Sequence, residues 1–491
     1  MAFLNEAPGF PRRLDAPTGA IESAASLPQV GGAIKVPLLA LLLAGAAVRL
    51  CLWFWFQHLP IEIVDEQDYN SLAKNLVEHG EFSYFPGTLT SIRPPLYPLL
   101  VAGVYTLFGL ENFQAVRLIQ AVMSLLNVVV LYGLGKEIAS RRTALWLAGL
   151  FCFYPSFLGF NNLLLTETLF TLLLCTFCYL IILACKRQAM RYLLVAGVVL
   201  GLATLTRSIL WMFPPVLALF LLICWQGSWP RRFVAVLAVV LPFALTMTPW
   251  AWRNTVLHKT FVPVDTMGGL NFMTGNYRHT PFYRSWDAIG IVGENSWYAE
   301  VFAAYPPSEY DTPGKIDKLA LKQGLLFVRD NPLLTLQRDI IKFFDFWGLE
   351  RELVAGAGRG IFGPLSGLVV VLLAVLIMGS YVAALFVGIF GLFLVPLGDR
   401  RTQYFLVLLV VYICGLHSLV FAHSRYHLPV MPLVLVFTAT ALTTRPTIWW
   451  QWRRGAFWLA AGLCILMVCG WIWGLAAGDM EKFRQSILAM I

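Results

Sequence analysis

Long apolar segments recur along the whole chain and are separated by short polar or basic stretches. An apolar run of about 20 residues is long enough to cross the hydrocarbon core of a bilayer as a helix. We therefore expect an all-α polytopic membrane protein. The pattern predicts eleven spans, at residues 36–56, 114–135, 143–160, 163–185, 193–206, 209–226, 233–251, 371–396, 402–421, 428–444 and 455–475.

Basic residues between these segments predict the orientation in the membrane, because lysine and arginine are enriched in cytoplasmic loops. The clusters lie at residues 136–142, 186–191, 231–232, 400–401 and 445–454. They all face the cytoplasm only if residues 94–110, which are apolar but short and rich in proline, do not span the membrane. We expect an interfacial or re-entrant segment there, on the outer face.

This topology divides the chain into five parts. They are a cytoplasmic tail at 1–35, a transmembrane core at 36–251 with a first periplasmic loop at 57–113, a modest periplasmic loop region at 252–362, C-terminal transmembrane helices at 363–475 and a tail at 476–491. Residues 318–348 carry apolar residues at helical spacing with lysine and arginine between them. That pattern predicts amphipathic helices on the outer membrane surface.

Composition excludes other classes of protein. The chain is 58% hydrophobic and 13% charged, with a mean hydropathy of +0.71, far from the balance of a soluble domain. Its net charge of +9 comes from the basic clusters between apolar runs, so we expect no nucleic-acid partner. All nine cysteines fall inside apolar segments, which leaves none in a polar loop to form a disulfide.

The first periplasmic loop is the densest polar interval in the first half of the chain and holds candidate chemistry. Asp65 and Glu66 directly follow the first span and begin an amphipathic helical pattern. A carboxylate there can act as a general base, and an adjacent acid can tune its pKa; the alternative is that Asp65 only caps the helix. Arg93 precedes two prolines and is suited to bind a phosphate. Its alternative is to reach the headgroups of ordinary lipids.

Three further charged residues lie at the outer ends of apolar segments. Glu167 is in LLLTETLFTLLL, Arg207 in LATLTRSILW and Arg425 in the short loop HSRYH. An acid at membrane depth is costly and indicates a functional site. Acids and arginines thus converge on one face, which suits a substrate with a phosphate at the interface and an apolar tail. No P-loop, GxSxG, HExxH or dinucleotide motif occurs.

Six motifs follow one another between residues 60 and 432: DEQDYNSLAKNL, IRPPLYPLL, LLLTETLF, LATLTRSIL, TPWAWRNTVLHKTFVPVDTMGGLNFMTGN and SRYHLPVMP. In this order they resemble the polytopic glycosyltransferases of the GT-C fold, in particular the bacterial family 39 branch related to protein O-mannosyltransferases and aminoarabinose transferases. The resemblance implies a GT-C fold and an enzyme that moves a hexose or pentose from a polyprenyl-phosphate donor, with inversion, to a lipid, glycan or protein acceptor. It also implies that the protein lies in the bacterial inner membrane, with its active site facing the periplasm. Membrane lipids are expected as further partners.

The same resemblance assigns roles to individual residues. Asp65 matches the aspartate expected to act as base or to orient the acceptor, with Glu66 as its neighbour in the catalytic pair. The residues expected to bind substrate are Tyr69, Arg93, Glu167, Arg207, Arg425 and Tyr426.

Two positions depart from the pattern of the aminoarabinose transferases. An acid that helps to bind a metal there is Ile92 here, so we expect no fixed metal, although a divalent cation stays open as a cofactor. A basic phosphate ligand shortly after the acidic pair is Asp68 here.

Two other functions remain open from the sequence. A flippase or transporter of lipid-linked sugars would move its substrate without forming a bond, but the inverted repeats and broken mid-membrane helices typical of transporters are not recognisable. A polymerase or ligase of diphosphate-linked glycans would differ from the predicted enzyme in its donor.

Overall fold

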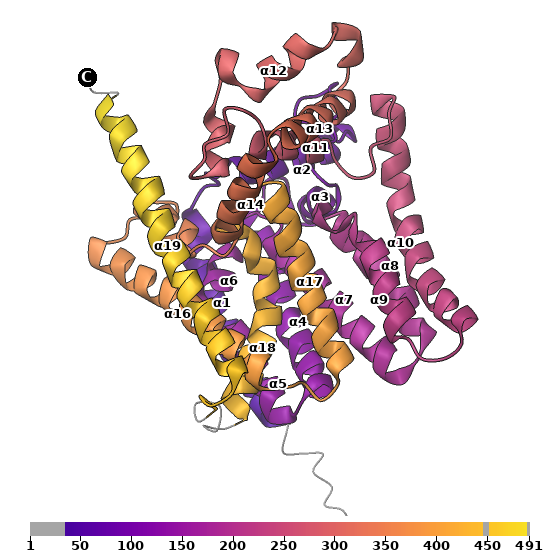
Figure 1. Ribbon diagram of the computed structural model, residues 1–491, viewed down its shortest axis with the longest axis vertical. Helices are drawn as coiled ribbons and strands as arrows, with labels where there is room; N and C mark the ends of the chain where they lie inside the picture. The colour runs from indigo at the N-terminus through magenta and orange to yellow at the C-terminus, as the bar shows by residue number, and fades with distance from the viewer. Residues whose placement is uncertain (1–34, 445–450, 489–491) are drawn as a thin grey trace, which may run out of the picture.

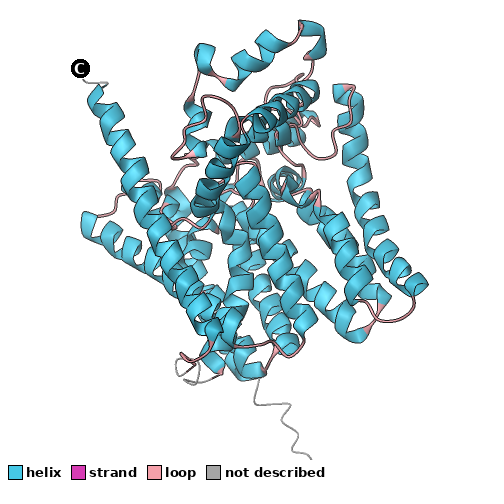
Figure 2. Ribbon diagram, viewed as in Figure 1, coloured by secondary structure: helices cyan, strands magenta, loops and turns pink. Residues whose placement is uncertain are grey.

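The computed structural model describes residues 35–444 and 451–488, and within that part the chain consists of helices joined by short loops, with no β-strand (Figure 2). Eight of the described helices are long and apolar enough to cross a membrane. They are α1 (Lys35–Trp55), α4 (Phe113–Ile138), α7 (Glu167–Arg187), α10 (Trp229–His258), α16 (Gly367–Leu394), α17 (Arg400–Leu419), α18 (Met431–Thr443), which continues the 3₁₀ helix η6 (Ser424–Val430), and α19 (Gly455–Leu488). The prediction of an all-α polytopic membrane protein is confirmed.

The predicted number of eleven spans is not confirmed, because three expected spans have a different form. Residues 143–160 divide into α5 (Arg141–Cys152) and α6 (Pro155–Phe160). Pro155 has no N–H to continue α5 and instead occupies the first turn of α6, where proline is favoured. Residues 193–206 and 209–226 form the shorter apolar helices α8 (Met190–Thr204) and α9 (Phe213–Cys224).

Residues 94–110, which we expected not to span, form α3 (Leu96–Phe108), a helix of 13 residues. At 1.5 Å per residue such a helix is about 20 Å long, shorter than the hydrocarbon core. Leu96 donates its backbone N–H to the carbonyl of Leu205 at 3.0 Å, so the start of α3 is tied to the outer end of α8. This contact keeps the loop before α3, which carries Arg93, close to the bundle.

Helix α7 lies inside the bundle and brings an acid to its outer end. In the apolar 18-residue stretch of α7, 72% of the residues are buried, against 11% in the corresponding stretch of α1. Helices α4 and α8 pack against α7. Glu167 is its first residue and is 1% exposed. A long helix buried on most sides is rigid, so its end is a firm support for a functional side chain.

Small residues let two pairs of spans approach closely. A Cβ added to Gly197 of α8 would lie 2.3 Å from the carbonyl oxygen of Val239 in α10. A Cβ added to Gly391 of α16 would lie 2.2 Å from the carbonyl oxygen of Phe437 in α18. Both contacts bring backbone against backbone, as at other glycine-mediated interfaces between membrane helices.

A layer of shorter helices covers the end of the bundle at the top of Figure 1, which we call the outer end because we expect it to face the periplasm. It consists of α2 (Val64–His79), α11 (Gly268–Gly275), α12 (Trp297–Ala304), α13 (Pro313–Asp330), α14 (Pro332–Phe346) and α15 (Glu352–Gly358). Helices α11, α12 and α13 share a small apolar core of their own. Helix α14 is amphipathic as predicted: Leu333, Leu336 and Ile340 are exposed while Arg338 and Lys342 are buried. Its place on a membrane surface stays a prediction.

We predict that Gly391→Ala destabilises the protein by about 1–3 kcal/mol, because the added methyl group overpacks the interface between α16 and α18. The matched control is Gly379→Ala on the same helix, where an added Cβ meets no atom within 4 Å. Thermal unfolding in detergent measures both variants. Equal midpoints would contradict the close approach of α16 and α18.

Candidate active site

The adjacent acids Asp65 and Glu66 at the start of α2 point to different partners. One carboxylate oxygen of Glu66 accepts backbone N–H groups of Glu62 and Ile63, at 3.3 and 3.2 Å, and the other accepts that of Leu164 at 2.8 Å. Glu66 therefore satisfies the free N–H groups before α2 and ties this helix to the loop before α7. Asp65 accepts no such backbone hydrogen bond, and its oxygens bind arginine side chains instead.

Asp65 is held between two arginines from distant parts of the chain. Its Oδ1 accepts from Nη2 of Arg93 at 2.6 Å, and its Oδ2 accepts from Nη1 of Arg425 at 3.0 Å. Arg93 also binds Asp68, one turn further along α2, at 2.8 Å. The side chains of Asp65 and Arg93 are partly buried, with exposed fractions of 28% and 25%.

The network continues into the bundle through Arg425. Its Nε donates to Oε1 of Glu167 at 2.5 Å, and Nη1 of Arg207 lies 3.7 Å from the same oxygen. Asp68, Arg93, Asp65, Arg425, Glu167 and Arg207 thus form a row of alternating charges. We call these six residues the charge row.

The charge row brings together the predicted residues Asp65, Arg93, Glu167, Arg207 and Arg425. Glu66 lies apart from it, since both of its carboxylate oxygens bind backbone groups.

Burial and neighbouring charges act against each other on Asp65. Burial opposes its ionisation, but the guanidinium groups of Arg93 and Arg425 outweigh this and hold the pKa of Asp65 below its usual value. Burial opposes the charge of Arg93 as well, but its interactions with Tyr69, Asp65 and Asp68 outweigh this and raise its pKa above the usual value. Asp65 is therefore a carboxylate at neutral pH and a weak base while both arginines bind it.

The two predicted tyrosines line the charge row. Arg93 lies over the ring of Tyr69, 5.6 Å from its centroid, and Arg207 lies over the ring of Tyr426 at 5.7 Å. Burial raises the pKa of Tyr69, which keeps its hydroxyl protonated. An aromatic face supports a guanidinium without neutralising it.

Residues outside the charge row fix the backbone that carries it. Glu350 accepts hydrogen bonds from Tyr154 at 2.9 Å and from Ser156, and Nε2 of His427 lies 3.1 Å from its Oε1. Nδ1 of His427 donates to the carbonyl of Phe346 at 2.7 Å. These bonds hold η6, the short helix that carries Arg425, against α6 and the end of α14.

The loop that carries Arg93 is fixed in a similar way. Ser91 donates to Asn254 at 2.8 Å and accepts from Arg253 at 2.8 Å.

The segment before α2 is also fixed. Arg117, buried in α4, donates to the carbonyls of Phe56 and Leu59 at 2.6 and 3.1 Å, and so holds the chain that leads into α2.

Sequence reasoning missed three acids near the site. Asp68 was noted only as a departure from a family pattern, yet it binds Arg93. Asp265, in the fifth motif, is half-buried and interacts electrostatically with Arg93, and desolvation raises its pKa. Glu350 lies between two helices in a stretch with no helical period to mark it. Only the groups that lie next to these acids in the folded structure distinguish them from other carboxylates outside the membrane spans.

No group of three or more His, Cys, Asp or Glu side chains in the described residues is placed to hold a metal ion. Asp65, Asp68 and Glu167 each bind a guanidinium instead. Whether the protein uses a divalent cation stays an open prediction.

Comparison with known proteins finds similar sequences among membrane glycosyltransferases. A family model described as dolichyl-phosphate-mannose-protein mannosyltransferase matches residues 92–252. An undecaprenyl phosphate-alpha-4-amino-4-deoxy-L-arabinose arabinosyl transferase of Pseudomonas savastanoi pv. phaseolicola is 28% identical over 237 residues. That match covers 45% of this chain and 44% of the relative, less than half of either.

Solved structures share the fold over most of the chain. The oligosaccharyltransferase AglB from Archaeoglobus fulgidus, in complex with an inhibitory peptide and a dolichol-phosphate, aligns with a TM-score of 0.52 at 16% identity. The alignment covers 90% of this chain and 56% of AglB. The apo form of the same archaeal enzyme gives 0.50 at 17% identity, over 89% of this chain and 55% of that one. ArnT from Cupriavidus metallidurans, in the apo state, gives 0.41 at 14% identity, over 82% of this chain and 76% of that one. The protein is a multi-span membrane protein with the GT-C fold, and it resembles glycosyltransferase family 39.

Proposed function

We propose that the protein is a membrane glycosyltransferase that takes a sugar from a polyprenyl-phosphate donor and passes it to a lipid, glycan or protein acceptor. The observation that carries this proposal is the position of Asp65 between Arg93 and Arg425. Such a site combines a base for the acceptor hydroxyl with cations for the donor phosphate. We place the reaction on the periplasmic face of the bacterial inner membrane, at the end of the bundle where α2 and α14 lie.

The arginines would stabilise the leaving group. When the bond between sugar and carrier breaks, negative charge grows on the carrier phosphate, and fixed guanidinium groups stabilise that charge in the transition state. Arg93 is the first candidate, because 25% of its side-chain surface is exposed, against 16% for Arg425. Arg425 lies on the other side of Asp65 and can share the same phosphate. No nucleotide is needed, since the carrier phosphate is itself the leaving group.

Donor binding would also activate Asp65. The phosphate competes with Asp65 for the hydrogen bonds of Arg93 and Arg425, and each bond that it takes removes a cause of the lowered pKa of Asp65. The carboxylate then becomes a stronger base at the moment when an acceptor hydroxyl needs to lose its proton. One carboxylate acting on the acceptor fits a direct displacement, which inverts the sugar.

The remaining predicted residues would position these groups. Glu167, 1% exposed at the start of α7, holds Arg425 and Arg207. Tyr69 and Tyr426 offer ring faces to Arg93 and Arg207, and their hydroxyl groups can contact a sugar. We assign Glu66 to the support of α2 rather than to proton transfer.

We predict that Asp65→Asn lowers transfer by about 10²–10⁴-fold, because the amide cannot accept the acceptor proton. The assay is release of free polyprenyl phosphate from a panel of polyprenyl-phosphate sugars offered with candidate acceptors. Glu62→Gln is the matched control: Glu62 is an exposed acid three residues earlier. Full activity in a well-folded Asp65→Asn protein would exclude Asp65 as the base, and movement of lipid across vesicles without donor cleavage would favour a transporter.

A second prediction concerns Arg93→Ala. We expect a higher KM for the donor, and we expect the acidic limb of the pH profile of kcat/KM to move to higher pH. The sign follows from the structure: Arg93 helps to hold the pKa of Asp65 down, so its removal lets that pKa rise. Arg329→Ala, at an exposed arginine of α13, is the control. An unshifted acidic limb would show that the titrating base is not Asp65.

A further inference from the structure

Arg207 differs from the other two arginines of the charge row, because its hydrogen-bonding groups are free. In the described part of the chain, none of its nitrogens donates a hydrogen bond, and its one ion pair places Nη1 3.7 Å from Oε1 of Glu167. Arg93 uses its Nε and Nη2, and Arg425 uses its Nε and Nη1. Arg207 is therefore the cation of the charge row that can bind a ligand without first giving up a partner.

The free nitrogens of Arg207 are accessible as well as unpaired. Its side chain is 19% exposed. Among the described residues, the unpaired side-chain atoms that are sealed from solvent include none of its nitrogens. A ligand that approaches from outside the bundle can therefore contact them directly.

Aromatic rings hold this guanidinium in place without neutralising it. Its central carbon lies 5.7 Å from the ring centroid of Phe170 in α7 and 5.7 Å from that of Tyr426 in η6. The ring of His417 in α17 stacks on Tyr426 in turn, with centroids 4.5 Å apart. Aromatic faces support a guanidinium and leave the N–H groups at its edge for an oxyanion.

The free donors of Arg207, rather than an excess of positive charge, favour an anion here. The charge row contains three acids and three arginines, so it is balanced as a whole. Glu167, the acid at Arg207, accepts its short hydrogen bond from Arg425 at 2.5 Å instead. An oxyanion that binds Arg207 thus gains charge-assisted hydrogen bonds and breaks none.

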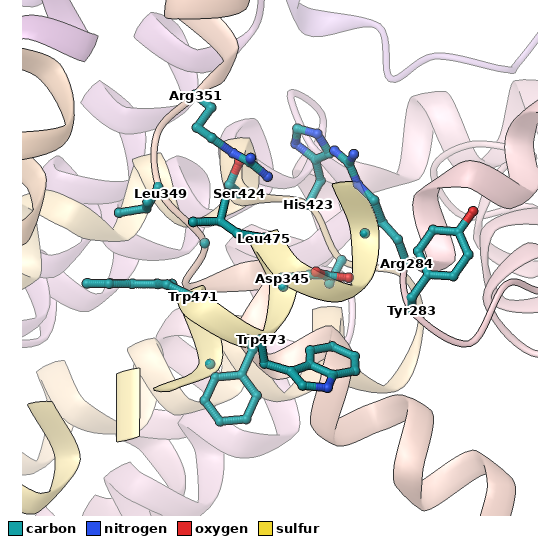
Figure 3. A pocket seen from close by; sticks show the side chains of 16 residues that line it. Tyr283, Arg284, Asp345, Leu349, Arg351, His423, Ser424, Trp471, Trp473 and Leu475 are labelled. Carbon is teal, nitrogen blue, oxygen red and sulfur yellow. The ribbon is translucent and has the colours of Figure 1, made fainter. Parts of the chain in front are cut away.

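The polar cavity between η6 and α19 offers no comparable cation (Figure 3). Arg284 and Arg351 border it, together with Asp345. Asp345 interacts electrostatically with both arginines, and Glu352 interacts with Arg284. An anion in this cavity would compete with these carboxylates, whereas no carboxylate lies at hydrogen-bond distance from Arg207 in the described chain.

The surroundings of Arg207 suit a phosphate that carries an apolar tail. Arg207 directly precedes the short helix η2 (Ser208–Leu210), and η2 and the following helix α9 both pack against α17. Met212, directly before α9, is 58% exposed, and Leu419, the last residue of α17, is 54% exposed. In a membrane protein, exposed apolar side chains at the ends of spans contact lipid, so a lipid phosphate can reach this corner from the bilayer.

We propose that Arg207 is the docking residue for the phosphate of the carrier lipid, which it binds before and after sugar transfer. The phosphate moves from Arg207 to Arg425, which meets the same oxygen of Glu167, and it displaces Asp65 only in that second step. The proposal rests on the proposed transferase function and specifies how the donor enters and how the carrier leaves.

The test measures binding of farnesyl phosphate to the full chain in detergent by isothermal titration, without an acceptor. The decisive variant is Arg207→Gln, which removes the guanidinium but breaks no hydrogen bond, so we expect its thermal midpoint to match that of the wild type. The matched control is Arg142→Gln, at an exposed arginine of α5. Farnesol and inorganic phosphate are the ligand controls.

We expect saturable binding of farnesyl phosphate to the wild type and to Arg142→Gln, and binding at least about tenfold weaker to Arg207→Gln. Farnesol, which has no phosphate, does not distinguish the three proteins. No saturable binding to the wild type, or equal binding to Arg207→Gln, overturns the proposal. Inorganic phosphate that binds as tightly as farnesyl phosphate shows an anion site only and overturns the assignment to a lipid.

A second measurement needs no variant. Phenylglyoxal modifies accessible guanidinium groups, so we expect mass spectrometry to find Arg207 modified before Arg93 and Arg425, which carboxylates hold. We expect farnesyl phosphate to protect Arg207 from the reagent. Modification of Arg207 that saturating farnesyl phosphate does not slow contradicts docking at this residue.

Turnover separates docking at Arg207 from the proposed function. In the donor-release assay, we expect farnesyl phosphate to inhibit competitively with the donor, with an inhibition constant that is higher for Arg207→Gln. Equal inhibition constants would exclude Arg207 as the docking residue. Failure of the transferase function would appear instead as no release of polyprenyl phosphate from any donor, whereas the binding measurement needs no turnover.

Discussion

The ion pairs that Asp65 makes with Arg93 and Arg425 are the interaction on which the outer end of the molecule depends. They join the start of α2 and the loop before α3 to Arg425 of η6, which lies 360 residues after Asp65 along the chain. Neither partner is fully exposed, so removing one would leave the other charge poorly solvated, which is costly. A site held together by opposite charges is also one that a phosphate can rearrange, because it competes for the same guanidinium groups.

The rest of the outer layer serves to keep these charges in place. Glu66 binds backbone groups at the start of α2 and before α7, and Glu350 with His427 holds η6. Both oxygens of each of these two acids bind backbone, Tyr, Ser or His groups, whereas the acids of the charge row bind guanidinium groups. The structure therefore distinguishes two kinds of carboxylate that look alike along the chain.

The short helix η6 carries the arginine at the centre of the charge row. Arg425 points from it to Asp65 and Glu167. Nδ1 of His427 donates to the carbonyl of Phe346, and Nε2 lies 3.1 Å from Glu350, so η6 is tied to the end of α14 and to the segment after it. These contacts fix the position of Arg425 relative to Asp65.

The sequence by itself determined the class of fold and most of the charge row. Apolar runs and basic loops are local properties, so they identified most of the spans, and the cost of a charge at membrane depth singled out Glu167. Asp65, Arg93, Arg207 and Arg425 stood out as charged residues in loops or at the ends of apolar segments. Only the tertiary structure decided the different roles of Asp65 and Glu66, the parts of Asp68, Asp265 and Glu350, and the break at Pro155. The roles of these acids depend on which groups contact them in the folded structure, and residue spacing in one sequence does not reveal those contacts.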